Sequence, residues 1–506
     1  MLYNLDWLRP GAVYPPESEL ERIQDANDNA LLFDGDSYEV YKKPLREAGV
    51  QIDRTLAAYR SEFGRFVEIN YYRLTALKVA DLLVGEPPVI KVEDDDKQAE
   101  LDEMLRRWGW TSMLAQGAID LSRFGDAVFR VYATEDGSRC TLYNPATCYK
   151  VVDPFDEQRI TAMVHCTLHN AGSREAPRWQ LLAQIHEDGR YTTRTYALAE
   201  RKAADVQNMT NGRILTAQKR FTIERLESEE ETENGLDGLA LFPLSQVKTS
   251  DRCWGRSDYD VIDPIMAEIW KRIGQISIIL DKNAAPDMSA PASAFAPNER
   301  TGKWELKTDG ALGGGNVWIQ EEGQAAPAYV TWDGNLTAAF AELDMLFREL
   351  KTVTEMGAVY DASLGASNIS TETMKATFVS PLSKVRRIAN GIEDGVKAII
   401  AAGCALDGID IAPGDLSIEW CDGLPNDERR EIENATLMLN AGMTTPAHEL
   451  QYRFGMTQEA AERLAQEAAD DKADRASAFG GFGLPGGMMQ EDANENADTV
   501  EAAAEG

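Results

Sequence analysis

The spacing of apolar residues predicts two long amphipathic helices in the second half of the chain. The first is expected to start at Asp263-Pro264, because an acidic N-cap and a proline in the first turn favour a helix start, and to end before Pro286. The second is expected around residues 336–353. In both, apolar residues recur at steps of three and four, as on one helix face. They are Ile262, Ile265, Ile269, Ile273, Ile276 and Leu280, then Leu336, Phe340, Leu343, Phe347, Leu350 and Val353.

A third long helix is predicted after a polar loop at residues 357–369. Pro381 is expected to kink or interrupt it, because proline has no backbone N–H to donate. Its apolar face carries Met374, Phe378, Leu382, Val385, Ile388, Ile392, Val396 and Ile399.

Between the first two helices, residues 284–334 are rich in proline and glycine. Strand-like pieces at residues 303–307, 316–320 and 328–332 predict a small β-rich tip that the two helices bracket.

A shorter period indicates strands in the first half of the chain. Turn signals Glu135-Asp136-Gly137 and Glu187-Asp188-Gly189 separate several of the segments, so an antiparallel meander is expected and the fold class is α+β. The acidic residues between 227 and 233 are interpreted as a solvated, mobile excursion. The expected strands are residues 127–133, 139–143, 159–168, 179–185 and 191–196.

The two ends of the chain are predicted to be mostly helical. Helices are expected before residue 110, with a stop at Gly85-Glu86-Pro87-Pro88, and acids Asp94 to Asp96 favour the start of a further helix over a metal site. Towards the C-terminus we expect a strand at residues 416–420 and helices at 427–440 and 457–469. Residues 477–506 are expected to be disordered, because large apolar side chains are few there.

Charge and composition exclude several classes of protein. With 51 Lys+Arg against 84 Asp+Glu, the net charge is −33, which excludes a basic nucleic-acid reader held mainly by phosphate neutralisation. The six cysteines show no C-x-x-C spacing and are expected to be reduced thiols. The first residues lack the layout of a signal peptide, and no apolar stretch is long enough to predict a membrane span.

No catalytic or metal-binding motif is complete. There is no P-loop, and Gly313-Gly314-Gly315 is interpreted as a flexible turn. The side chains of His165, Cys166 and His169, with Cys140 and Cys148, match no compact zinc spacing. His448-Glu449 begins like a zinc protease motif, but Tyr452 stands where its second histidine would be. We therefore expect a protein that is not an enzyme and that has no cofactor or metal.

Five segments, in this order, carry a resemblance to the portal proteins of tailed bacteriophages, in particular the siphophage type. Each alone is a weak match, and their joint order is the specific signal. They are the helix end Val79-Ala80-Asp81-Leu82-Leu83-Val84-Gly85-Glu86-Pro87-Pro88, the strand entry Arg123-Phe124-Gly125-Asp126-Ala127-Val128-Phe129-Arg130-Val131-Tyr132, Trp254-Gly255-Arg256-Ser257-Asp258, Ser370-Thr371-Glu372-Thr373-Met374-Lys375 with Pro381-Leu382, and Asp422-Gly423-Leu424-Pro425. Many relatives have small residues where Thr371 and Thr373 stand.

The resemblance implies a division of the chain into the parts of a portal. These are a wing at 1–256, made of the helical N-terminal part and the β meander, a stem helix at 257–283, a clip at 284–334 and a second stem helix at 335–356. They continue with a tunnel loop at 357–369, a long kinked helix and wing strand at 370–424, crown helices at 425–470 and a disordered acidic tail at 471–506.

The resemblance also implies the function. Portal proteins form a ring, usually a homododecamer, at one capsid vertex, and its channel serves DNA packaging and ejection. The expected partners are further copies of this chain, the terminase large subunit, a head-tail adaptor or connector protein, the major capsid and scaffolding proteins, and double-stranded DNA passing through the channel, without a membrane. The protein is expected in the virion after assembly in the host cytoplasm. The alternatives are a carboxylate-based nucleic-acid-processing enzyme and a non-phage helical scaffold.

Candidate channel residues come from the tunnel loop and the third helix. The loop offers one charge, Asp361, and neutral hydrogen-bonding groups on Ser363, Ser367 and Asn368. In the third helix, Lys384, Arg386 and Arg387 either contact DNA phosphates or pair with carboxylates of an adjacent subunit.

Candidate docking residues lie in the clip. The clip is too small to bury the indoles of Trp304, Trp318 and Trp332 within itself. We therefore expect these side chains to contact a neighbouring subunit or a docking partner.

Overall fold

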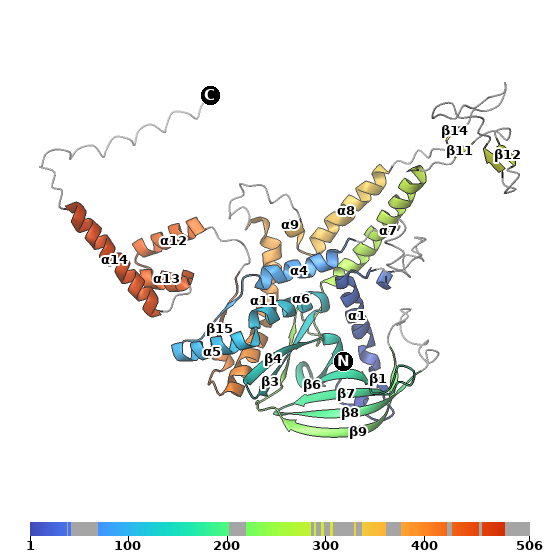
Figure 1. Cartoon of the computed structure of the whole chain (residues 1–506), viewed down its shortest axis with the longest axis horizontal. Coiled ribbons are helices and arrows are strands. Elements are labelled where there is room, and N and C mark those ends of the chain that lie inside the picture. Colours follow the sequence, from blue (N-terminus) through green and yellow to red (C-terminus); the bar gives the residue numbers. More distant parts are fainter. Residues whose placement is uncertain are drawn as a thin grey trace. The chain divides into compact units, whose positions relative to one another are not determined.

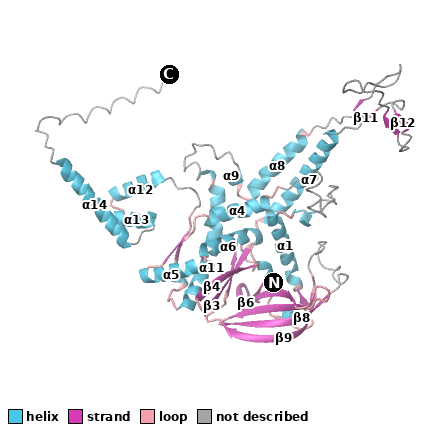
Figure 2. Cartoon of the chain, viewed as in Figure 1, coloured by secondary structure: helices cyan, strands magenta, loops and turns pink. Residues whose placement is uncertain are grey.

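The fold comes from a computed structural model, which describes residues 1–37, 39–41, 69–201, 219–284, 288–289, 295–297, 304–306, 328–329, 336–360, 376–421, 428–454 and 458–480. The chain divides into two compact units, Met1–Leu424 and Pro425–Gly506. The described residues contain both long helices and antiparallel sheets, so the expected mixture of helix and sheet is confirmed (Figures 1 and 2). Across this part of the chain, no helix combines the length and apolarity needed to span a bilayer.

The largest sheet is antiparallel and has the strand order β1-β9-β8-β7-β6-β5. One face packs on the N-terminal segment, because Leu2, Trp7 and Leu8 share a core with Val164 and Leu181. The expected meander is present from β5 to β9, although β5 and β9 were not predicted. The first two expected strands, at residues 127–133 and 139–143, belong to a second sheet instead. The strands are β1 (Val13–Tyr14), β5 (Cys148–Asp153), β6 (Asp156–Asn170), β7 (Trp179–Glu187), β8 (Arg190–Glu200) and β9 (Phe221–Glu233).

The interpretation of the acidic run as a mobile excursion is wrong. Residues 227–233 form the second half of β9. Residues 228–233 pair one to one with β8, and Glu227 lies at a register shift between the two strands. Arg194 Nε lies 2.9 Å from Glu229 Oε1, and Arg190 Nη1 lies 3.0 Å from Glu231 Oε1. The cross-strand arginines explain why a run of glutamates can stay in a strand, since opposite charges on facing strands attract.

A second sheet has the order β10-β3-β4 and carries the main helical layer. Its strands are β3 (Asp126–Thr134), β4 (Gly137–Tyr143) and β10 (Leu241–Ser245). The core of the molecule joins apolar side chains of this sheet to α4 (Tyr71–Val84), α5 (Asp95–Trp108), α6 (Trp110–Phe124) and α11 (Val379–Asp407). In Figure 2 these helices gather around β3 and β4. As expected, Asp94 caps α5, because its carboxylate accepts from the backbone N–H groups of Asp96 and Lys97.

The two predicted stem helices are α7 (Tyr259–Ala284) and α8 (Thr337–Val353), which pack side by side (Figure 1). Their contact buries Ile262, Ile269 and Leu343 with Leu350. The expected end before Pro286 is confirmed, whereas the start at Asp263-Pro264 is wrong by one turn. Pro264 is the sixth residue of the helix, so its missing N–H removes one intrahelical hydrogen bond, the one that Asp260 O would accept.

Residues 376–377 are helical, Phe378 forms a turn, and the third long helix, α11, begins at Val379, so the helix is interrupted three residues before Pro381, as expected. The helix follows a turn at Phe378, and the Leu382 amide donates to Phe378 O at 2.9 Å. A short helix α9 (Gly357–Tyr360) occupies the first four positions of the expected tunnel loop. The expected strand at 416–420 is β15 (Ser417–Glu419), which pairs with β2 (Val89–Lys91).

The remaining elements of the first unit are short, except for α1 (Leu20–Asp34). In the region expected to be the clip, β11 (Met288–Ser289) pairs with β14 (Ala328–Tyr329), and β12 (Phe295–Pro297) pairs with β13 (Trp304–Leu306). The strand predicted at 316–320 lies outside the described residues. Single 3-10 turns occur at Asp6–Leu8, Glu17–Glu19, Pro145–Thr147 and Pro413–Asp415.

The second unit is helical where it is described. Two of its helices, α12 (Glu428–Asn440) and α14 (Gln458–Gly480), match predicted ones, and α13 (Pro446–Phe454) was not predicted. The tail was expected to be disordered from residue 471, and by its composition from Ser477, but α14 continues to Gly480. Alanine and charged residues without proline explain the extra turns, because they are compatible with a helix even without an apolar face.

Candidate functional site at the base of the long helices

Two of the segments that carry the portal resemblance meet in one place. The turn Phe124-Gly125-Asp126 joins α6 to β3, and Gly255-Arg256-Ser257-Asp258 leads into α7. Gly125 O accepts from the Gln246 amide at 2.9 Å, and Gln246 O accepts from the Arg256 amide at 3.2 Å. A Cβ on Gly125 would lie 2.6 to 2.7 Å from backbone carbons of Arg256 and Gly255, so only glycine fits there.

Asp258 is the centre of this meeting point. Its amide donates to Ser122 O at 2.9 Å, and its Oδ2 accepts from the Ser122 hydroxyl at 2.6 Å. Its Oδ1 lies 2.9 Å from Lys384 Nζ on α11, and both side chains are less than a tenth exposed. A charge buried this deeply requires a partner, so Lys384 ties α11 to the start of α7.

The same lysine also holds the end of the other stem helix. Lys384 Nζ donates to the carbonyl of Thr354, directly after α8, at 2.9 Å. The next residue, Glu355, has φ +59°, and its carboxylate lies 2.7 Å from Arg387 Nη2. We refer to the contacts of Ser122, Gly125, Asp258, Thr354 and Lys384 as the junction. It fixes the base of α7 and α8 against α11.

The candidate channel residues of the third helix differ in burial and in their partners. Lys384 is buried in the junction beside Asp258, and Arg387 pairs with Glu355. Both therefore have a carboxylate partner within their own chain. Arg386 lies on the exposed side of α11. The loop candidates Asp361, Ser363, Ser367 and Asn368 lie outside the described residues.

The start of the expected tunnel loop is anchored to α4. The Tyr360 hydroxyl, at the end of α9, lies 2.6 Å from the Thr75 hydroxyl, and its ring contacts that of Tyr71. Burial raises the pKa of Tyr360, so the phenol is neutral at physiological pH. Nearby, the hydroxyls of Tyr41 and Tyr72 both donate to Asp263 Oδ1 of α7, at 2.9 and 2.8 Å.

A second buried ion pair lies on the other side of the junction. Lys150 Nζ lies 3.0 Å from Asp126 Oδ1 and donates to Cys253 O at 2.7 Å, and the Trp254 ring lies beneath it at 4.1 Å. The other oxygen of Asp126 accepts from the Gly255 amide at 2.9 Å. Sequence reasoning missed Lys150, because a single lysine in a short strand carries no signal of burial.

Of the three tryptophans that are candidates for docking in the clip, the structure describes one. Trp304 lies in β13, whereas Trp318 and Trp332 lie outside the described residues. The described part of the chain contains no group of three side chains suited to hold a metal ion. Burial lowers the pKa of His165 to about 4 and of His186 to about 3, so both imidazoles are neutral at pH 7.

Residues 57–180 match the family model described as "Phage portal protein, SPP1 Gp6-like". This range contains α4, α5, α6 and the strands β2 to β6, with two of the five segments named above. The match confirms the predicted resemblance to phage portal proteins. Among curated proteins, no relative matches the chain.

Two solved structures from gene transfer agent particles match this chain in the comparison of folds. One carries the description "Virion of native gene transfer agent (GTA) particle", with 10% identity, a TM-score of 0.42 and coverage of 76% of this chain and 89% of the other. The second is "Neck of native GTA particle computed with C12 symmetry", with 10% identity, a TM-score of 0.36 and coverage of 75% and 88%.

Proposed function

We propose that the protein is a portal subunit. Several copies form a ring at one capsid vertex, DNA is packaged and ejected through the channel of that ring, and a terminase and head-tail connector proteins dock on it. The observation that carries the proposal is the family match over residues 57–180, together with the meeting of two resemblance segments at the junction.

The stem helices support self-association. Their shared face is buried, yet Leu280, Phe340 and Met345 remain about half exposed. A ring in which each subunit contacts the next through two different faces would cover such side chains, because closure leaves no free end. We propose twelve subunits as the number to test first.

The charge of the chain supports passage of DNA without retention. With a net charge of −33, the ring carries a strong negative potential, which repels phosphates unless basic side chains gather locally. Two of the basic residues of α11 are neutralised by Asp258 and Glu355. The loop at 361–369 is proposed to meet the duplex, and the clip with Trp304, Trp318 and Trp332 is proposed to dock terminase or an adaptor.

Negative-stain electron microscopy of the purified full chain tests this function. We expect rings with a central hole and a single symmetry, and light scattering should give a mass that is a multiple of 55.9 kDa. Monomers at every concentration, or closed aggregates without a hole, would contradict the portal assignment. A nuclease assay on linear DNA tests the enzyme alternative, for which we expect no cleavage.

A further inference from the structure

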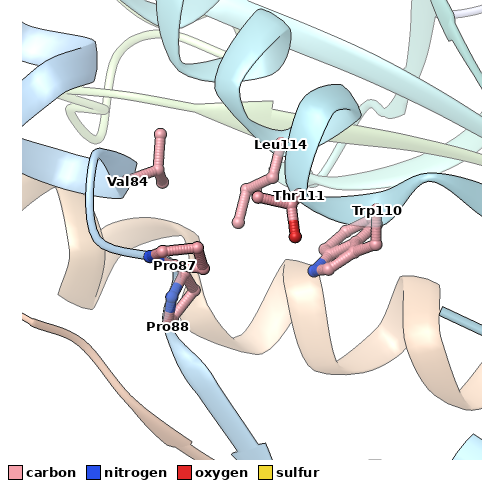
Figure 3. A pocket seen from close by; sticks show the side chains of 6 residues that line it. All are labelled: Val84, Pro87, Pro88, Trp110, Thr111 and Leu114. Atoms are coloured by element: carbon pink, nitrogen blue, oxygen red, sulfur yellow. The ribbon is translucent and has the colours of Figure 1, made fainter. Parts of the chain in front are cut away.

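The pocket beside the turn that ends α4 is too small to bind a ligand. Its space of about 20 Å³ holds about one water molecule. A partner of this protein is therefore expected on an open surface, and one edge of the largest sheet offers such a surface. The walls of the pocket, shown in Figure 3, are Val84, Pro87, Pro88, Trp110, Thr111 and Leu114.

The outer edge of β9 is unpaired over its second half. The short strand β1 pairs with β9 only at Phe221 and Thr222, and the hydrogen bonds of the N-terminal segment continue as far as Ile223. In the part of the chain that the structure describes, no strand pairs with this side of β9 from Glu224 to Glu233, and β9 forms the lower margin of the sheet in Figure 1. A row of free N–H and C=O groups on a strand edge can pair with a further strand.

The pairing with β8 shows which residues present these groups. The Asn234 amide donates to Gly189 O, in the turn between β7 and β8, at 3.1 Å, so Asn234 faces β8. Residues 228–233 pair one to one with β8, and successive residues of an antiparallel strand direct their N–H and C=O groups to opposite sides. The N–H and C=O groups of Glu229, Glu231 and Glu233 therefore point away from β8, towards the free edge.

The side chains of these three glutamates lie on one face of the sheet, because they stand at every second position. Arg194 pairs with Glu229 at 2.9 Å and Arg190 pairs with Glu231 at 3.0 Å, and both glutamate side chains stay about half exposed. Arg190 also lies 3.4 Å from Glu187. At this end of the sheet four carboxylates thus accompany two guanidinium groups, which leaves an excess of negative charge.

This charge determines which strand can be added. A second copy of β9 would place glutamates opposite glutamates, and DNA would bring phosphates, so both would be repelled. A segment with Lys or Arg at every second position would instead place each cation opposite one of the three glutamates, because directly opposed residues of a sheet share a face.

From these observations we propose that the free edge of β9 binds an extended basic segment of a partner protein as an added strand. The main chain of that segment exchanges N–H···O=C bonds with Glu229, Glu231 and Glu233, and its Lys or Arg side chains lie opposite the same three residues. The residues between these cations lie on the other face of the sheet, beside Glu230 and Thr232. Threonine suits those positions, because it favours strands and is polar.

Fluorescence anisotropy with labelled peptides and the full chain tests the proposal. The probe is fluorescein-Thr-Lys-Thr-Lys-Thr-Lys-Thr-amide. Its control carries N-methyl groups on the three lysine amides, which keeps the charge and removes the donors. We expect the control to bind at least about tenfold more weakly, because three hydrogen bonds are lost. Equal binding of both peptides, or no binding of either, would overturn the proposal.

A third peptide tests a second copy of this chain as the occupant. The counterpart fluorescein-Thr-Glu-Thr-Glu-Thr-Glu-Thr-amide carries alternating glutamates, as β9 itself does. We expect it not to bind, because its charges repel those of the edge. If it binds as tightly as the lysine peptide, the edge accepts another copy of the chain, and the basic partner proposed here is wrong.

Matched variants at one position locate the binding. Glu231→Pro removes an N–H group that points to the free edge, where a strand tolerates proline, whereas Glu231→Gln removes the same charge and keeps the N–H group. We expect the proline variant to bind the lysine peptide at least about threefold more weakly than the glutamine variant. Glu103→Gln, on the exposed side of α5, should bind it as the parent does.

Equal binding by the two variants at position 231 would show that the edge is not used, and the proposal fails. The melting curve of Glu231→Pro shows whether this variant folds. If it does not fold, the comparison between the lysine peptide and its N-methylated control decides.

Discussion

The contacts of Lys384 in the structure differ from the role that its sequence context suggests. In the sequence it belongs to a basic stretch of a helix in an acidic chain, which is compatible with contact to DNA. In the structure its amine is buried between Asp258 and the carbonyl of Thr354. The amine therefore holds three helices together. Of the three predicted basic residues, Arg386 and Arg387 remain exposed, and Arg387 pairs with Glu355.

We predict that Lys384→Met destabilises the protein by about 3–5 kcal/mol, because Asp258 then remains as a buried charge without its partner. The double variant Lys384→Met with Asp258→Asn should recover part of this loss. Arg386→Met, two positions away and exposed, is the control and should change stability by less than about 0.5 kcal/mol. Urea unfolding followed by circular dichroism measures all four proteins. Equal effects at positions 384 and 386 would mean that the buried pair does not form.

His186 gives the fold a dependence on pH. Its imidazole is fully buried between the two sheets, stacks on Tyr191 and has no hydrogen-bond partner, while Arg130 and His165 face it. Burial, with Arg130 and His165 as weaker causes, lowers its pKa to about 3. The unfolded chain takes up this proton near pH 6.5. The contribution of neutral His186 is therefore complete above pH 6.5 and is lost as the pH falls towards 3.

We predict that acidification from pH 7.5 to 4.5 destabilises the protein by about 2–3 kcal/mol through His186, from roughly 1.4 kcal/mol for each pH unit below 6.5. Asp120 acts in the opposite direction, because burial raises its pKa to about 6. His186→Phe keeps a ring against Tyr191 and cannot be protonated, so the difference between this variant and the parent isolates the histidine. If the urea midpoints of both proteins fall equally with pH, His186 is not the titrating group.

At the scale of elements, the sequence predicts those with strong internal periodicity. The faces of α7, α8 and α11 repeat every three to four residues, and they were located within a few residues. The start of α7 was displaced by one turn, because this helix contains Pro264 as its sixth residue and not at its boundary. In α11, by contrast, Pro381 lies in the first turn, where proline is favoured. β5 and β9 were missed, since the pattern of β9 is set by its neighbour β8, which supplies Arg190 and Arg194 from elsewhere in the chain.

The candidate site was predictable only in part for the same reason. The segments around Gly125 and Ser257 could be named from their sequence, but their meeting depends on contacts across more than a hundred residues. The partners that complete the junction, Lys384 and Thr354, come from two further elements. No local pattern marks such pairs.

The exposed side chains of α8 lead to a prediction about assembly. Phe340 is 49% exposed, and under the proposed function it contacts the next subunit. Phe340→Asp should therefore shift rings to monomers in size-exclusion chromatography with light scattering, without lowering the melting temperature of the monomer. Ala341→Asp adds the same charge at the neighbouring exposed position and is the control. Intact rings of the Phe340 variant would show that this face of α8 is not part of the interface.

At the scale of the whole molecule, the proposed function requires a chain of net charge −33 to let DNA pass while remaining close to it. Two of the basic groups of α11 already have carboxylate partners of their own chain within 3 Å: Lys384, which is buried in the junction, and Arg387, which is half exposed. What remains for the passing duplex is the proposed tunnel loop, whose predicted contact residues are neutral apart from Asp361. Weak, neutral contact suits movement, since each phosphate neutralised by a cation adds to the affinity.

Adding cations to that loop should therefore slow packaging. In the double variant Ser363→Lys with Asn368→Lys, each subunit gains two positive charges, and every phosphate contact formed makes binding depend on salt with a slope of about −0.9. We expect slower packaging in an in vitro assay with purified motor and proheads, and partial recovery of the rate when the salt concentration is raised. Ser112→Lys with Gln116→Lys adds the same charge at exposed positions of α6 and should package at the parental rate. If the loop variant, with rings confirmed by microscopy, also packages at the parental rate at low salt, the loop does not meet the moving DNA, and the contact must be sought on another element of the channel.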